Sequence, residues 1–108
     1  MAIIWETADR LGRKVALTDT GWAHIQGRHE DMVEFQEKIR HAIEFADEEY
    51  RDARYARSDV HYWTLQPDSI PIRVIVNYRP AAPSEWIGEI VTAFRSDRRA
   101  KGEKLKWP

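Results

Sequence analysis

The chain has 108 residues, a length that fits one domain, so we treat residues 1–108 as a single domain. It contains no cysteine, which excludes a disulfide framework, a thiolate nucleophile and a zinc ribbon. No stretch approaches the roughly 20 apolar residues of a membrane helix, and "MAIIWETADRLGRK" lacks the apolar centre of a signal peptide. The sequence therefore predicts a cytoplasmic protein that has no membrane partner.

The net charge of −1 conceals an asymmetry between the two halves of the chain. Residues 1–50 carry 6 basic and 11 acidic side chains, whereas residues 51–108 carry 11 basic and 7 acidic ones. The segment from Arg95 to Lys106 alone holds six basic and two acidic residues. Such a basic end is typical either of a surface that binds a polyanion or of a solvated, frayed tail.

The first predicted element is a small hairpin, because the short apolar or alternating runs "AIIW" and "KVALT" flank "GRK". Thr18 and Thr20 then offer capping side chains before a short helix in "GWAHIQGRH". Gly27 weakens this helix and helps to end it near His29.

The clearest helix covers residues 31–45. Phe35, Ile39 and Ile43 recur there at intervals of four and form one apolar face. Near residue 47 the hydrophobic period changes from 3.6 to 2, as is typical of a change from helix to strand.

A run of strands follows the helices. We expect strands over residues 60–66, 70–78 and 86–95, with the short polar segment "EYRDARYA" as an edge strand. Turn residues in "PDSIP" and "RPAAPSE" separate these strands. The order predicts an α+β fold, in which N-terminal helices pack on one face of a largely antiparallel, about four-stranded sheet.

Several kinds of binding site are absent from the sequence. There is no Walker loop and no glycine-rich dinucleotide turn, and the four histidines lack HExxH spacing. His24 and His29, five positions apart, project about 140 degrees apart on a helix, too far to chelate one metal. We therefore expect neither a metal nor a cofactor.

The first candidate group of functional residues lies in "HIQGRH". An imidazole titrates near neutral pH and suits either proton-transfer role in catalysis. His24 shares a helix face with Arg28. His29 is either a reactive group or a capping or core histidine at the helix end. His41 is expected to be solvated, and neither His41 nor His61 is expected to contribute to function.

The second candidate group lies at the end of the last strand. Thr92 and Phe94 share one strand face, and Arg95 lies on the other. Thr92 is either a half-buried strand residue or a hydrogen-bond donor to phosphate. Trp107 either packs on the sheet edge or stacks on a base. The basic residues that we expect to bind nucleic-acid phosphates are Arg95, Arg98, Arg99, Lys101 and Lys104.

The order of five segments carries a resemblance to a known family. These segments are "WAHIQGRHED", "YRDARY", "VHYW", "IRVIVNY" and "GEIVTAFRSDRRAKGEKLKW". In this order they resemble the phage-associated branch of the barnase/EndoU/colicin/RelE-like nuclease superfamily, over roughly residues 20 to 107. The resemblance implies a metal-independent ribonuclease on a helix-plus-four-stranded-sheet scaffold. It often implies a toxin, with an antitoxin or immunity protein as its partner.

The resemblance also implies roles for particular residues. His24 and His29 match the helical histidines, Arg28 the arginine between them and Thr92 the strand hydroxyl, while Arg95 and Lys101 match the basic positions that follow. Cleavage of RNA without a metal needs a base for the 2′-hydroxyl, an acid for the leaving 5′-oxygen and cations for the developing charge. We expect His24, His29, Thr92 and Arg95 to supply catalysis, and Arg28 to contact RNA.

Two other classes of function stay open at this point. The chain could be a non-catalytic module that binds RNA or an antitoxin, in which case a basic stripe would contain no histidine. It could also be an interaction protein, in which case a large exposed patch would surround Trp63 and Trp86. A histidine, Thr92 and Arg95 in one concave site would favour the enzyme.

Overall fold

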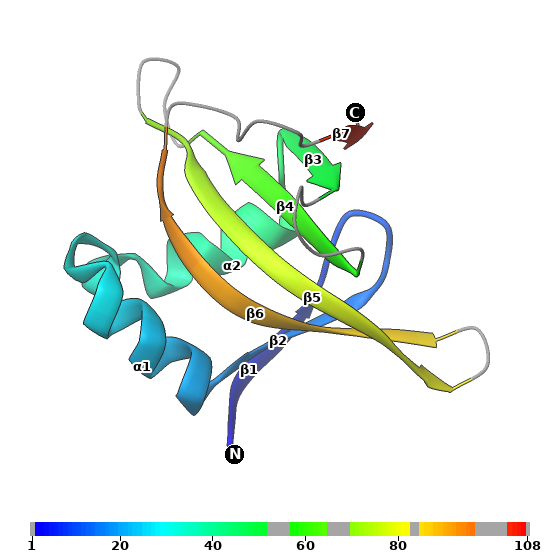
Figure 1. Ribbon diagram of the computed structural model, residues 1–108, viewed down its shortest axis with the longest axis horizontal. Coiled ribbons are helices and arrows are strands. Elements are labelled where there is room, and N and C mark those ends of the chain that lie inside the picture. Colours follow the sequence, from blue (N-terminus) through cyan, green and yellow to red (C-terminus); the bar gives the residue numbers. More distant parts are fainter. Residues whose placement is uncertain (1, 52–56, 65–69, 83–84, 97–103, 108) are drawn as a thin grey trace.

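The computed structural model describes residues 2–51, 57–64, 70–82, 85–96 and 104–107 (Figure 1). For residues 81, 82, 85, 86 and 104–107 it describes the backbone alone. The elements in chain order are β1 (Ile3–Ala8), β2 (Lys14–Thr18), α1 (Asp19–Arg28), the 3-10 helix η1 (Glu30–Phe35), α2 (Gln36–Glu44), β3 (Glu48–Arg51), β4 (Ser58–Trp63), β5 (Ile72–Ala82), β6 (Glu85–Arg95) and β7 (Lys104–Trp107).

The described strands form one seven-stranded sheet in the order β1-β2-β6-β5-β4-β3-β7. The β2–β6 pair is parallel, and the other described pairs are antiparallel. In Figure 1, α2 lies behind the sheet and α1 lies beside β6. We call the sheet face opposite the helical core the outer face. On β5 it carries the residues that alternate with those of the hydrophobic core, namely Arg73, Ile75, Asn77 and Arg79.

The predicted four-stranded, largely antiparallel sheet with helices before it is wrong. The described sheet has seven strands, and β1 and β2 precede both helices. The hairpin itself was expected, but its docking against β6 was not, because strand alternation does not reveal the direction of a neighbouring strand. Burial of Val15 and Leu17 in the core fixes that position.

The antiparallel pairing of the three later strands agrees with the sequence prediction. Of the residues expected at 60–66, 70–78 and 86–95, residues 60–63, 72–78 and 86–95 lie in β4, β5 and β6, which pair in that order. Residues 65 and 66 lie outside the described part of the chain. The segment expected as an edge strand overlaps β3, which instead lies between β4 and β7.

The helix predicted over residues 31–45 is divided. Its first part is η1, and α2 begins only at Gln36. The division lets the chain turn from α1, which packs along β6, to α2, which packs across β4 and β5. Ile39 and Ile43 are fully buried as predicted, while Phe35 packs at the edge of the core.

His41 is partly buried instead of solvated, because its ring packs edge-on against Trp63 and Phe45. Trp63 itself packs against the core, and the side chain of Trp86 is outside the described part of the structure. The exposed tryptophan patch that would favour an assembly protein is therefore not seen around Trp63.

Candidate functional site

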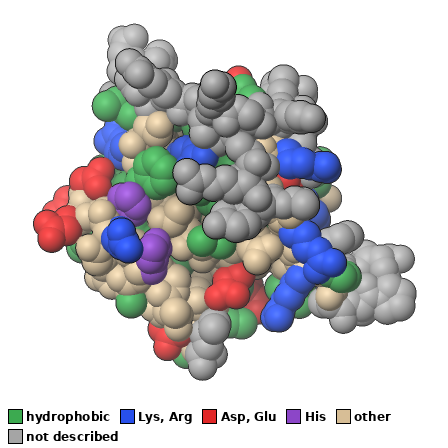
Figure 2. Space-filling view, in the orientation of Figure 1, with side chains coloured by type: hydrophobic (Ala, Val, Ile, Leu, Met, Phe, Trp, Pro, Cys, Tyr) green, Lys and Arg blue, Asp and Glu red, His purple; other side chains and the backbone are tan. Residues whose placement is uncertain are grey.

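The outer face of β6 holds the candidate site, beside α1. A β-bulge at Val91 shifts the register, so that Ile90 pairs with Val76 while Thr92 pairs with Ile75. Beyond the bulge the ladder is regular, and Thr92 and Phe94 therefore point to the same face. Figure 2 shows two histidines at the surface beside a basic side chain, over the region where Figure 1 draws α1 and β6.

His29 caps α1 and reaches over β6. Its backbone N–H donates to the carbonyl of Ile25, so the capping role expected for this residue belongs to its backbone. Its ring stacks on Phe94 with 4.9 Å between ring centroids. Burial lowers the pKa of His29 below 6.5, the neighbouring His24 and Arg28 side chains add to this, and Asp31 opposes it. The imidazole is therefore neutral at pH 7, as a general base requires.

Arg73 is a buried cation on the same face. It pairs with Phe94 across β5 and β6, and its guanidinium carbon lies 5.1 Å from the centroid of that ring. Its Nε donates to the hydroxyl of Tyr62 at 2.9 Å. Arg73 is only 8 % exposed, so its charge is weakly screened. Sequence reasoning missed it, although a single arginine inside the apolar run "IRVIV" was a usable signal.

Thr92 is partly buried, as one of the two readings of the sequence expected. Its Oγ1 atom is inaccessible to solvent and has no hydrogen-bond partner among the residues that the structure describes. A buried hydroxyl without a partner costs about 1–3 kcal/mol. A ligand oxygen would satisfy this donor once the groups that cover the hydroxyl move aside.

Arg95 does not join this group. It follows Phe94 on the opposite face, as the strand alternation predicted. Its Nε and Nη2 atoms donate to the carbonyl of Ile70 at 3.1 and 2.9 Å, and the guanidinium lies over Phe35 at 5.7 Å. In this structure Arg95 fixes the end of β6 against the loop before β5.

The structure describes none of the other basic side chains of the tail. Arg98, Arg99 and Lys101 lie outside the described residues, and only the backbone of Lys104 and Trp107 is described. β7, which contains these last two residues, pairs with β3 at the far edge of the sheet from α1.

Two basic residues that sequence reasoning missed lie on the outer face. Lys14 of β2 and Arg79 of β5 flank Ile87 of β6 on either side. Both are exposed, and neither makes an ion pair with another described residue. They also line a cavity of about 180 Å³ beside β1.

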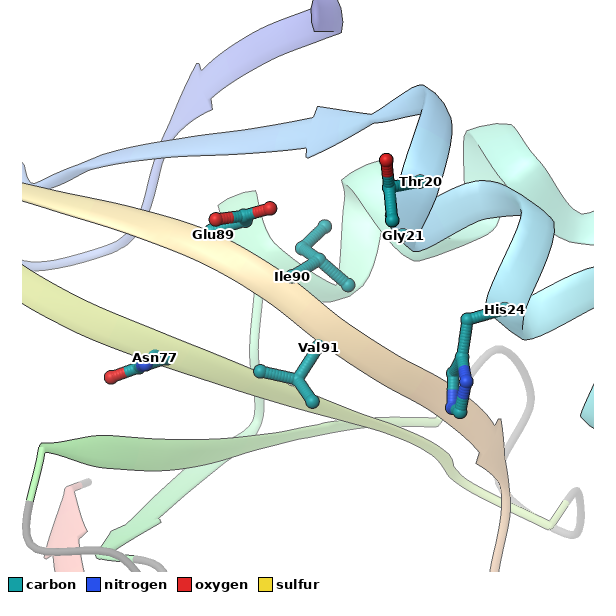
Figure 3. Close-up of a pocket in the computed structure, with 7 residues that line it drawn as sticks. All are labelled: Thr20, Gly21, His24, Asn77, Glu89, Ile90 and Val91. Carbon is teal, nitrogen blue, oxygen red and sulfur yellow. The ribbon is translucent and has the colours of Figure 1, made fainter. Parts of the chain in front are cut away.

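His24 and the first turn of α1 border a cleft of about 330 Å³ on the outer face (Figure 3). In this view Glu89 and Asn77 lie on one side and His24 on the other, with Ile90 and Val91 between them. The remaining lining residues are Thr20 and Gly21. Arg28, four residues after His24, is exposed on α1.

A separate cluster of buried polar side chains lies where the β1–β2 turn meets β3 and β4. Ligand atoms of Asp9, Glu49 and His61 lie within 4.8 Å of one another, close enough to bind a cation together. Arg13, however, donates to Asp9 at 2.8 Å and to Glu49 at 2.7 Å. A third bond joins it to Asp59 at 2.9 Å. The guanidinium is thus the cation of this cluster. We call the group formed by Arg13, Asp9, Glu49 and Asp59 the ion-pair lock.

Tyr78 extends the ion-pair lock into the core. Its hydroxyl donates to Asp9 at 2.8 Å and lies 2.8 Å from Nε2 of His61. Burial, together with the charge of Asp9, raises the pKa of Tyr78 far above its usual value, so the hydroxyl stays protonated. His61 is therefore a structural residue.

Comparisons with known proteins do not assign the chain to a family. No family model, no curated protein and no solved structure matches it. Within the described part of the chain, none of the helices has the length and apolar character needed to cross a bilayer.

Proposed function

We propose that this protein is a metal-independent endoribonuclease whose site lies on the outer face of β6. The observation that carries the proposal is the arrangement of three groups along that strand. A neutral imidazole stacks on Phe94, a buried guanidinium lies near the same ring, and a hydroxyl without a partner lies two residues earlier. These groups are a base, a cation and a hydrogen-bond donor, which metal-free phosphodiester cleavage needs.

In the proposed reaction the scissile phosphate displaces the groups that cover the Thr92 hydroxyl and binds there, with His24 of α1 and His29 at the C-cap of α1 as the two imidazoles. His29 removes the proton of the 2′-hydroxyl, and the 2′-oxygen attacks phosphorus. The bond to the 5′-oxygen breaks, and His24 protonates that oxygen. The products are a 2′,3′-cyclic phosphate and a 5′-hydroxyl. Thr92 donates to a non-bridging oxygen, while the charge of Arg73 stabilises the negative charge that develops there.

The biological context is part of the same proposal. The resemblance of the sequence to the phage-associated nuclease branch supports a toxin-like role in the cytoplasm, with RNA as substrate and an antitoxin or immunity protein as partner. The basic residues Lys14 and Arg79 support binding of a polyanion on the same face. They equally support a non-catalytic RNA-binding module, which the following experiment distinguishes.

The test is single-turnover cleavage of labelled RNA by the purified protein in EDTA, with analysis of the product ends. We expect His29→Ala to lower the rate by about 10²–10⁴ while RNA affinity changes little. Thr92→Val, which removes the hydroxyl and keeps the shape, should lower the rate by about tenfold, the value of one hydrogen bond of 1.4 kcal/mol.

His41→Ala is the matched control, because His41 lies behind the sheet against Trp63 and should leave the rate unchanged. Wild-type protein that leaves varied RNAs intact, or a His29→Ala variant that cuts at full rate, would contradict the proposal. Intact RNA with retained binding would indicate the binding module.

A further inference from the structure

The cleft beside His24 adjoins the proposed reaction centre and has a different chemistry. Its volume of about 330 Å³ is within the range of small-molecule clefts. Glu89 and Asn77 form a cross-strand pair on the outer face, so a carboxylate and an amide lie next to each other. A carboxylate repels phosphate, so the cleft suits an uncharged group with hydrogen-bond donors.

The distance along β6 matches one nucleotide step. Because of the bulge at Val91, Glu89 and Thr92 pair with Asn77 and Ile75, which are only two residues apart on β5, so they lie roughly 7 Å apart at about 3.3 Å per residue. His24 lies across the cleft from Glu89, and Val91 gives the cleft an apolar wall. A base attached to the nucleotide that His24 protonates would therefore reach Glu89.

We infer that this cleft binds guanine, as the base of the nucleotide that follows the scissile bond; the assignment to that nucleotide rests on the proposed function. Guanine is the base whose Watson–Crick edge presents two adjacent donors, N1–H and N2–H, to the two oxygens of a carboxylate. The amide of Asn77 can donate to O6 of guanine. Adenine and cytosine present one amino group beside a ring nitrogen that the carboxylate of Glu89 repels.

The other polar contact of Glu89 leaves it able to bind a base. The hydroxyl of Thr18 donates to its Oε1 at a long 3.3 Å. On the side away from Thr92, the next row of the outer face holds Lys14 and Arg79. The 3′-phosphate of a nucleotide in the cleft would point toward these cations.

The test measures binding of each of the four ribonucleoside 3′-monophosphates to the protein. Titration calorimetry gives the affinities, and NMR of the backbone amides reports on the fold and the binding position. We expect 3′-GMP to bind at least tenfold more tightly than the adenine, cytosine and uracil nucleotides. Glu89→Gln should remove this preference, because the amide presents a donor where guanine needs an acceptor. Glu37→Gln is the control, since Glu37 is an exposed carboxylate on α2, behind the sheet.

Equal binding of all four nucleotides, or a guanine preference that survives Glu89→Gln in a protein with an unchanged amide spectrum, would overturn the inference. The binding assay does not depend on cleavage. It therefore tests whether the cleft binds guanine even where RNA stays intact and the proposed function fails. Where RNA is cut, a wild-type preference for cleavage before guanine that Glu89→Gln loses supports the inference. Cleavage without base preference overturns the inference and leaves the ribonuclease proposal standing.

Discussion

The ionisation of His29 is set by its immediate neighbours. Burial lowers its pKa, so the neutral base is lost only as the pH falls below 6.5, and the acid limb of the rate profile should lie there. Arg28→Gln removes a cation and should raise this pKa, whereas Asp31→Asn removes an anion and should lower it further. Each shift should be about 0.2–0.7 pH units, because an exposed charge pair is worth about 0.2–1 kcal/mol.

NMR titration of the His29 ring measures both shifts without any substrate. The two variants are each other's controls, since they change the charge by one unit in opposite directions at neighbouring exposed positions. Shifts of the same sign would show that the nearby charges do not set the pKa.

Arg13 is a second residue whose environment predicts a large effect. Its three carboxylate partners have side chains that are 0 to 6 % exposed. Arg13→Met leaves these charges buried without their cation and should lower the free energy of unfolding by about 3–5 kcal/mol. Arg40→Met, which breaks a more exposed pair with Glu44, should cost at most about 1 kcal/mol. Urea unfolding measures both, and equal losses would refute the ion-pair lock.

At the scale of elements, the close packing of β5 against β6 depends on Gly88. A Cβ atom there would lie 2.6 Å from Cγ1 of Val76 and 2.8 Å from Cε1 of Tyr78. Gly88→Ala should therefore destabilise the protein by about 1–3 kcal/mol. A Cβ atom at Gly27 would meet no heavy atom within 4 Å, so Gly27→Ala should stabilise α1 by up to about 1 kcal/mol. Thermal unfolding distinguishes them, and an unchanged midpoint for Gly88→Ala would contradict this packing.

At the scale of the whole molecule, the outer face combines a proposed reaction centre, a cleft and two cations along one strand. If Lys14 and Arg79 contact phosphates, each neutralising change to Gln should reduce the slope of log affinity against log salt by about 0.7 for single-stranded RNA. Lys38→Gln on α2, behind the sheet, should leave the slope unchanged. Equal slopes in all variants would exclude the outer face as the RNA path.

The sequence by itself determined part of the local structure. The switch of hydrophobic period near residue 47 correctly separated the helical part from the antiparallel β4–β5–β6 strands. Alternation also assigned Thr92 and Phe94 to one face and Arg95 to the other. These features depend on neighbours two to four residues apart, which periodicity reports directly.

Tertiary structure alone decided where those elements meet. The parallel docking of β2 against β6 and the burial of Arg73 beside Phe94 join residues far apart in the chain, and no local pattern encodes such pairs. The same holds for Glu89 and Asn77, which face His24 across a cleft. The composition of these segments shows which groups are available. Only packing of the apolar faces around the core fixes which of them share a surface.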